Sequence, residues 1–273
     1  HPTWAAGKLR DWLLRRQPAT AWPCRDTIHT LLTRHGQVRR RRRAAVALVP
    51  PHHLTRPTAP NLVWTVDFKG QFCTRDGVLC YPFTLRDGFS RYVLRCHALT
   101  SVRFGVTQPQ MARAFAEFGL PLCIRSDNGA PFGARALAGL SRLAVWWLRL
   151  GIWPERIRPG QPGENGSHEQ FHAVLKRETA RPPAPTRAAQ QHRFGRFVTE
   201  YNHERPHDAV DHAPPATRYV PSPRAYPSHV PPPEYPLEWT VRRVSSAGQI
   251  KSSSRPLFLT SVLADEDVAF EPL

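Results

Sequence analysis

Residues 62–68 read Leu62-Val-Trp-Thr-Val-Asp-Phe68, in which polar Thr65 and Asp67 alternate with apolar residues. This alternation is typical of a β-strand, because successive side chains of a strand point to opposite faces of the sheet. Turn-favouring Asp-Gly pairs then divide the following chain. We therefore expect three strands linked by hairpins, at 62–70, 77–86 and 91–98.

Helices and strands are expected to alternate after the hairpins. The periodicity of apolar residues predicts helices at about 108–118, 134–150, 164–179 and 187–202, a short strand at 122–126, and a strand or loop with Ile152 and Ile157. Hairpin-linked strands followed by alternating helices and strands are the order of a ribonuclease-H-like α/β fold. We assign residues 62–215 to this core.

The flanking segments differ from the core in composition. Residues 1–43 are basic and helical in pattern, which is consistent with a helix-turn-helix-like DNA-binding segment, and prolines mark a linker at 44–61. A proline-rich stretch at 216–236 is expected to be a stiff linker. Residues 237–273 hold short alternating runs, which predict a small β module, with an incomplete module as the alternative.

Charge points to a polyanionic partner. The chain has 273 residues and a formal net charge of +17, and residues 1–60 hold twelve Lys or Arg but only two Asp. Nucleic acid is the partner that such a balance favours, although a solvated basic surface is the alternative. A membrane is not expected, because no segment reaches the roughly 20 apolar residues of a spanning helix.

Three carboxylates stand on separate expected elements. Asp67 lies on the first strand, Asp127 follows the strand at 122–126, and Glu169 lies in the helix at 164–179. Carboxylates are the ligands that Mg²⁺ prefers, and two Mg²⁺ ions held in this way can activate both oxygens of a phosphodiester exchange. The set predicts a metal-dependent enzyme that acts on DNA.

The expected helix at 164–179 places several polar residues on one face. At 100° per residue, Asn165, Glu169, His172 and Lys176 share one face. Lys176 would then point toward the carboxylates and could meet a DNA phosphate, with ordinary solvent exposure as the alternative. The run of arginines Arg39, Arg40, Arg41, Arg42 and Arg43 is the other candidate DNA contact.

The chain resembles the retroviral-integrase-like DDE transposases, most closely the bacterial insertion-sequence group labelled IS481. The residues that carry the resemblance include Trp64-Thr-Val-Asp-Phe-Lys69, Arg125-Ser-Asp-Asn-Gly129, Pro154-Glu-Arg-Ile-Arg-Pro159, Glu164-Asn-Gly166, Leu175-Lys176 and Tyr201-Asn-His-Glu-Arg-Pro-His207. The resemblance implies a ribonuclease-H-like core that uses Mg²⁺, for which Mn²⁺ can substitute. It gives the DDE roles to Asp67, Asp127 and Glu169.

The same resemblance implies partners and a place of action. They are double-stranded DNA at element ends and target, a homo-multimer assembled on DNA, and the nucleoid of a bacterial cytoplasm. It favours Glu169 over Glu164 as the third carboxylate. Two alternatives stay open, a nuclease limited to hydrolysis and an inactive DNA-binding remnant. Because His1 is not the product of a start codon, we expect the sequence to be part of a longer chain.

Overall fold

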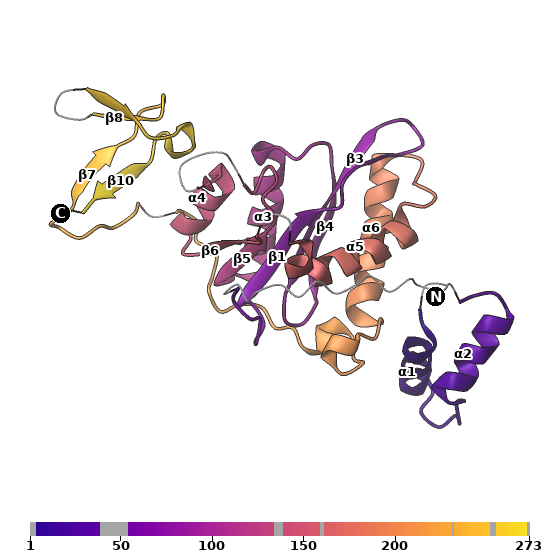
Figure 1. Ribbon diagram of the computed structural model, residues 1–273. Coiled ribbons are helices and arrows are strands. Elements are labelled where there is room, and N and C mark those ends of the chain that lie inside the picture. Colours follow the sequence, from indigo (N-terminus) through magenta and orange to yellow (C-terminus); the bar gives the residue numbers. More distant parts are fainter. Residues whose placement is uncertain are drawn as a thin grey trace.

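The computed structural model describes residues 4–38, 54–133, 139–158, 161–230, 232–251 and 255–271. Arg39 to Arg43 and most of the expected linker at 44–61 lie outside these ranges. Figure 1 shows a central core with a pair of helices at one end and small sheets at the other. No helix among the described residues is both long enough and apolar enough to cross a membrane.

A six-stranded mixed sheet forms the centre of the core. Its strands are β1 (Val63–Phe68), β2 (Phe72–Cys73), β3 (Leu79–Asp87), β4 (Val93–Leu99), β5 (Cys123–Ser126) and β6 (Trp153–Arg156). β3 pairs antiparallel with β1, β2 and β4, whereas β5 runs parallel to both β1 and β6. The three expected hairpin strands are therefore confirmed, with the short β2 as an addition.

Helices cover both faces of this sheet (Figure 1). α3 (Phe104–Phe118) and α4 (Arg142–Arg149) pack their apolar side chains with Trp64, Val66 and Phe83 on one face. α5 (Gly166–Thr179) and α6 (Arg187–His203) pack on the other face with Cys80 and Val93. The alternation of β1 thus sends Trp64 and Val66 toward α3, and Thr65 and Asp67 toward α5.

The helix expected at 134–150 is shorter in the structure. α4 begins only after Ser141, whose hydroxyl accepts a hydrogen bond from the Ala144 N–H and caps the helix. Just before it, Gly139 has a φ of 67°, a left-handed conformation that a continuing helix does not allow. Residues 134–138 lie outside the described ranges.

The N-terminal part consists of α1 (Ala6–Arg16) and α2 (Arg25–Arg34), as the helical spacing predicts. α1 contacts the end of the core: the Arg15 guanidinium donates to the His212 carbonyl over 2.7 Å. Trp4 is 5% exposed and lies 5.7 Å beneath the guanidinium of Arg205. The helix-turn-helix arrangement itself stays a prediction.

The C-terminal strands form two separate two-stranded sheets, β7 (Thr240–Arg243) with β10 (Asp267–Phe270), and β8 (Gln249–Lys251) with β9 (Pro256–Phe258). They approach the core at α4, where Arg149 and Glu266 form a half-buried ion pair of 2.5 Å. A barrel-like module stays a prediction.

The proline-rich stretch expected to be a linker packs along the core. Tyr219 stacks on Tyr92 with ring centroids 4.5 Å apart, and Tyr226 contacts Phe115. The Arg224 guanidinium donates to the carbonyls of Pro121, Leu150 and Gly151. The stretch therefore lacks long regular elements, as its prolines predict, but it is held to the core and does not act as a free spacer. The domain boundaries themselves stay predictions.

We expect Arg224→Gln to destabilise the protein by about 1–3 kcal/mol, because it removes hydrogen bonds from a charged donor to three carbonyls. Urea unfolding measures the loss. Arg242→Gln is the matched control, because Arg242 lies exposed on β7 and bonds only the adjacent Val241 carbonyl among the described residues. Equal unfolding midpoints for Arg224→Gln and the control would contradict this role of the stretch.

Candidate active site

The pairing of β1 with β5 brings two predicted carboxylates to one edge of the sheet. The parallel register sets Thr65 opposite Arg125. Two residues further along both strands, this register places Asp67 level with Asp127. Neighbouring strands lie about 4.8 Å apart, so both side chains leave the carboxyl ends of adjacent strands.

Asp67 has a strongly perturbed acidity. The pKa of Asp67 is raised to about 7, mainly by burial, then by the Asp127 carboxylate and to a smaller extent by Glu169. The Phe68 N–H, which donates to Asp67 Oδ1 over 2.6 Å, and the charge of Lys69 oppose this rise only in part. The charges of Asp127 and of Glu169 therefore both reach Asp67.

Asp127 sits in a short loop after β5 that is fastened at two points. The Gly129 N–H donates to Asp127 Oδ1 over 3.1 Å, and the Asn128 amide donates to the Ile157 carbonyl over 2.7 Å. Burial raises the pKa of Asp127, while the Gly129 hydrogen bond lowers it. The loop thus holds a half-buried carboxylate beside Asp67.

Glu169 and Glu164 have different surroundings. Glu169 is exposed on the first turn of α5, and its charge reaches Asp67. Glu164 lies in the 3₁₀ turn before α5, η2 (Pro162–Asn165), where it accepts from the Arg158 N–H over 2.8 Å and pairs with the Arg158 guanidinium over 2.6 Å. Glu169 is thus free of the Arg158 pairing that engages Glu164, and its place as the third member of the set stays a prediction.

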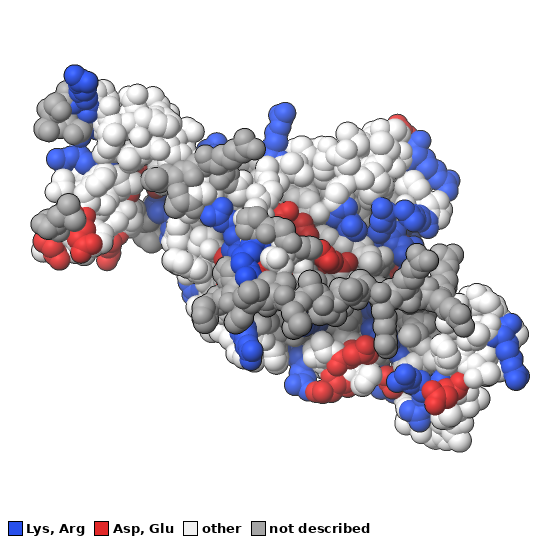
Figure 2. All heavy atoms as spheres, viewed as in Figure 1, with Lys and Arg blue, Asp and Glu red and all other residues white. Residues whose placement is uncertain are grey.

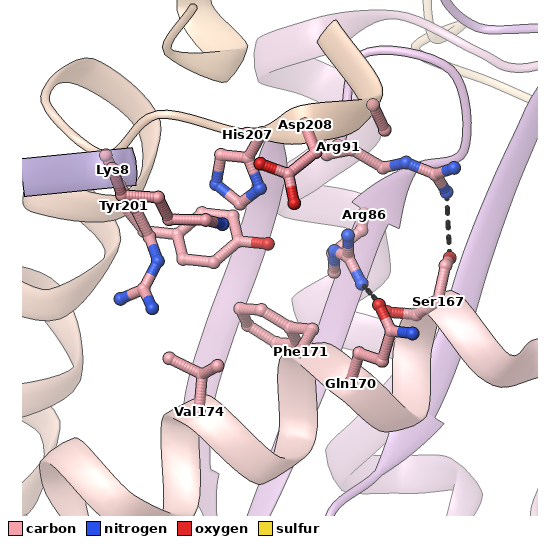
Figure 3. A pocket seen from close by; sticks show the side chains of 12 residues that line it. Lys8, Arg86, Arg91, Ser167, Gln170, Phe171, Val174, Tyr201, His207 and Asp208 are labelled. Atoms are coloured by element: carbon pink, nitrogen blue, oxygen red, sulfur yellow. Dashed lines mark hydrogen bonds between the residues drawn. The ribbon is translucent and has the colours of Figure 1, made fainter. Parts of the chain in front are cut away.

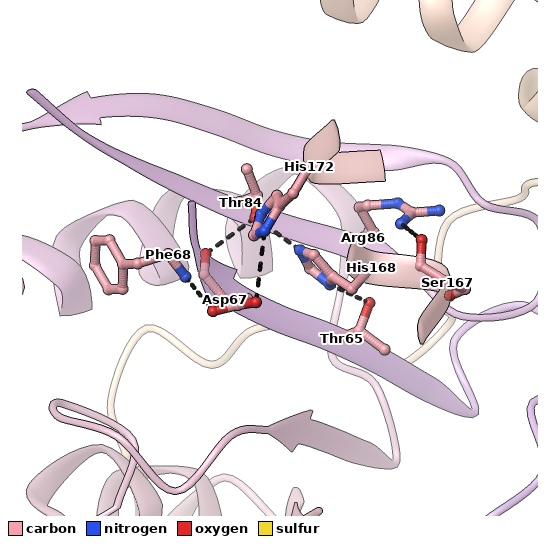
Figure 4. A network of polar contacts seen from close by, with 8 residues as sticks. All are labelled: Thr65, Asp67, Phe68, Thr84, Arg86, Ser167, His168 and His172. Atoms are coloured by element: carbon pink, nitrogen blue, oxygen red, sulfur yellow. Dashed lines mark hydrogen bonds and ion pairs between the residues drawn. The ribbon is translucent and has the colours of Figure 1, made fainter. Parts of the chain in front are cut away.

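A network of threonines and histidines adjoins Asp67 (Figure 4). The Thr84 hydroxyl is 3.0 Å from the Asp67 carbonyl and 2.7 Å from Nε2 of both His168 and His172. His168 Nδ1 is 2.9 Å from the Thr65 hydroxyl. The network connects β1, β3 and α5 at the carboxylates.

The network determines which nitrogens carry protons. A hydroxyl has one proton and two lone pairs. Because Thr84 donates to the Asp67 carbonyl, we assign it as the acceptor of an Nε2–H from each histidine. Burial keeps both rings neutral: it lowers the pKa of His172 to about 3 and the pKa of His168 well below its usual value. The lone pair of His172 Nδ1 then faces Asp67 Oδ2 at 3.5 Å.

Asp67, His168 and His172 also form a group whose potential ligand atoms lie within 4.8 Å of one another. Such a mixed set suits imidazole-binding metals better than Mg²⁺. However, both nitrogens of His168 already have threonine partners, so this ring has no lone pair left for a metal. We interpret the histidines as supports of Asp67.

The expected polar face of α5 needs a correction. Glu169 and Lys176 are exposed, as expected, but His172 is 3% exposed and Asn165 is 5% exposed and precedes the helix. His172 is buried because its position is one turn from His168, on the face that packs on Thr84. The His168/His172 spacing of four residues is the signal that would have placed both rings on one face.

Two lysines border the site. Lys69 and Lys176 line one shallow pocket, and the charge of Lys69 acts on both Asp67 and His172. Lys69 is a residue that the sequence interpretation missed as a possible phosphate contact, although it follows Asp67 by two positions. Figure 2 shows basic side chains over the N-terminal helices, the core and the C-terminal sheets, and a small acidic group bordered by basic ones on the core.

Family comparisons agree with this arrangement. Two family models, both described as Integrase core domain, match residues 57–162 and 150–215. The chain is 28% identical over 184 residues to an uncharacterised 31.7 kDa protein of insertion element IS407 from Burkholderia multivorans, covering 66% of this chain and 62% of that protein. It is 27% identical to an uncharacterised 39.2 kDa protein of insertion element IS476 from Xanthomonas euvesicatoria, covering 66% of this chain and 50% of that protein.

A solved structure shows the same fold. A chain of the simian T-cell lymphotropic virus intasome in complex with PP2A regulatory subunit B56 gamma superposes with a TM-score of 0.52 at 16% identity, over 90% of this chain and 94% of that chain. The fold is thus a mixed α/β, ribonuclease-H-like one. The chain is thus similar to integrase core domains and to insertion-element proteins, and it spans between half and two thirds of the length of those relatives.

Asp67→Asn is expected to stabilise the metal-free protein at pH 8. The pKa of Asp67 is about 7 in the folded protein and 3.8 ordinarily. Between these pH values the folded protein binds a proton at Asp67 that the unfolded chain does not bind. The ionised carboxylate therefore destabilises the fold fully only above pH 7. Asn carries no charge and can donate to the free lone pair of His172. The gain should be roughly 1–4 kcal/mol at pH 8 and should fade below pH 7.

Thermal unfolding in chelator at pH 8 and pH 6 measures this difference. Asp76→Asn is the matched control with the opposite sign, because hydrogen bonds from Thr74 and Val78 lower the pKa of that exposed turn carboxylate. If Asp67→Asn melted below the wild type at pH 8, or showed the same difference at both pH values, buried charge repulsion at Asp67 would be disproved.

Proposed function

We propose that this protein is a DNA transposase of the IS481 type that cleaves insertion-sequence ends and joins them to target DNA in a metal-dependent reaction. The observation that carries the proposal is the register of β1 and β5, which sets Asp67 and Asp127 at one edge of the sheet, where the charges of Asp127 and Glu169 both raise the pKa of Asp67. Fixed carboxylates that repel one another at a half-buried site are stabilised by bound cations.

The donor set fits Mg²⁺, with Mn²⁺ as a substitute. The three predicted ligands supply only carboxylate oxygens, which hard divalent cations prefer. Among the described residues, the three carboxylates do not form a group as tight as that of Asp67 with the two histidines. We therefore propose that metal binding is weak until DNA adds phosphate oxygens. Bound there, two ions would supply charge stabilisation for the attacking and the leaving oxygen of the phosphodiester.

The chain's own residues would orient the reacting strand. The Phe68 N–H donates to Asp67 Oδ1, which fixes the orientation of this carboxylate. Lys69 and Lys176 line the pocket that borders the site, and their ammonium groups can bind phosphates as point charges. Positioning of this kind is a large part of the catalysis of phosphoryl exchange.

The basic N-terminal part is proposed to bind the DNA. α1 and α2 supply a helical pair that contacts the core, and Arg39 to Arg43 follow α2 in the sequence. We propose double-stranded element ends and target DNA as partners, and a homo-multimer as the acting assembly. These substrates would place the activity in the nucleoid of the bacterial cytoplasm.

The two glutamates can be separated by activity. We expect Glu169→Gln to lose strand transfer by orders of magnitude with little loss of thermal stability, because an exposed carboxylate holds little of the fold together. Glu164→Gln is the matched control: it should keep strand transfer but lose about 1 kcal/mol of stability, because it gives up a charge-assisted pair with Arg158.

The measurement uses pre-cleaved DNA ends from the inverted repeats that flank the gene, with Mg²⁺ or with chelator. Chelator should stop the wild-type reaction. The assignment fails if Glu164→Gln is inactive while Glu169→Gln joins DNA. Products of hydrolysis without any joined strand would instead indicate a nuclease.

Replacement of Arg39 to Arg43 by glutamine should weaken DNA binding and flatten its salt dependence. Each phosphate contact that is lost should reduce the slope of log affinity against log salt by about 0.9. The matched control replaces the same five residues by lysine, which keeps the charge. Fluorescence anisotropy with a labelled duplex at several salt concentrations measures both quantities. Unchanged affinity and slope in the glutamine variant would rule out this segment as a DNA contact.

A further inference from the structure

A cavity of about 200 Å³ lies on the flank of α5 away from the carboxylates (Figure 3). α1, the end of β3, the start of α5 and the chain after α6 surround it. Its charged and polar lining includes Lys8, Arg86, Arg91, Arg205, His207 and Asp208. The cavity therefore joins the N-terminal helices to the core.

The cations of this cavity exceed the anions that could neutralise them. Arg205 pairs with Glu178 over 2.8 Å. Arg86 donates to the Ser167 carbonyl over 2.9 Å and Arg91 donates to the Ser167 hydroxyl over 2.8 Å, but within the described ranges neither forms an ion pair with a carboxylate. Asp208 is the single acidic lining residue, and its side chain is 75% exposed.

Arg86 is the most unusual of these residues. It is 2% exposed, its guanidinium lies 4.6 Å over the Phe171 ring, and its Nε has no hydrogen-bond partner. Burial of this cation is costly, because it removes the hydration of the guanidinium. Burial lowers the pKa of Arg86, and the charge of Asp87 opposes this effect only in part. An anion beside Arg86 would lower the free-energy cost of burying its charge.

Two neighbours add donors and further positive charge. His207 Nε2 is buried and also without a partner. Burial, Lys8 and Arg86, in that order, lower the pKa of His207 to about 2, so its ring is neutral. Burial and the charge of Arg205 also lower the pKa of Lys8. An anion in the cavity would oppose all of these effects.

We propose that this cavity is a binding site for a phosphate group. A tetrahedral oxyanion offers several acceptor oxygens, which matches the guanidinium, ammonium and imidazole donors that converge here. The phosphate belongs either to a DNA backbone or to free inorganic phosphate. The proposal does not rest on the transposase chemistry, because none of the three carboxylates lines the cavity.

The site would couple two parts of the protein. A phosphate held between Lys8 and Arg86 would fasten α1 to the core. It would also steady the start of α5, because both Arg86 and Arg91 bond to Ser167, two positions before Glu169. Occupancy of the cavity would thus connect the N-terminal helices with the helix that carries a proposed metal ligand.

Calorimetric titration of the full chain with inorganic phosphate, at pH 7 and constant ionic strength in chloride, tests the site. We expect one saturable site, and a rise in melting temperature with phosphate. Lys8→Gln should weaken phosphate binding about tenfold or more, because it removes one charged donor. Lys251→Gln, the same change on exposed β8, should bind as the wild type does.

Arg86→Met is a second variant, in which the methionine keeps an apolar contact with Phe171. Circular dichroism checks that this variant is folded. The folded variant should not bind phosphate. Absence of saturable phosphate binding to the wild type, or equal affinities of Lys8→Gln and Lys251→Gln, would overturn the proposal. If a short duplex displaces phosphate from the wild type but does not do so in the Lys8→Gln variant, a backbone phosphate is the natural occupant. Binding that the duplex leaves unchanged supports free phosphate.

Discussion

The parallel pairing of β1 with β5 is the constraint on which the site depends. It sets the ends of two strands side by side, so that Asp67 and Asp127 leave the sheet at the same edge. A shift of the register by one residue would turn Asp67 toward α3 and bring Trp64 out of the core, because side chains alternate along a strand. Trp64 is fully buried against Phe115, which makes such a shift costly.

The Thr84 network extends this constraint to the third element. By accepting from His168 and His172 and donating to the Asp67 carbonyl, one hydroxyl ties α5 to two central strands. This attachment also fixes the position of Glu169, because Glu169 is the next residue after His168 on α5. The site therefore has strands and a helix as its support, while the charges of Asp127 and Glu169 disfavour the ionised form of the buried Asp67.

The sequence was informative where a pattern reflects local physical chemistry. The alternation around Thr65 and Asp67 predicted β1, and the helical pattern predicted within residues 1–43 agrees with α1 and α2. The order of strands and helices was sufficient to predict the ribonuclease-H-like arrangement, and the carboxylates follow from it.

Tertiary contacts decided what the sequence could not show. His172 has the spacing of an exposed residue, but Thr84, far away in the sequence, gives it a buried partner. The proline-rich stretch around Arg224 has the composition of a linker, yet carbonyls at the ends of α3 and α4 hold it. The Arg86 cavity depends on residues of α1, β3 and α5 lining one space, an arrangement that no local pattern indicates.

The central claim is that three carboxylates, and not the histidine group, hold the catalytic metal. Anomalous scattering from crystals grown with Mn²⁺ and a pre-cleaved DNA end tests it most directly. The account predicts Mn²⁺ peaks between Asp67 and Asp127 and between Asp67 and Glu169, with His168 and His172 still bonded to Thr84. A single peak coordinated by Asp67 and the two imidazoles, with Asp127 and Glu169 turned away, would contradict it.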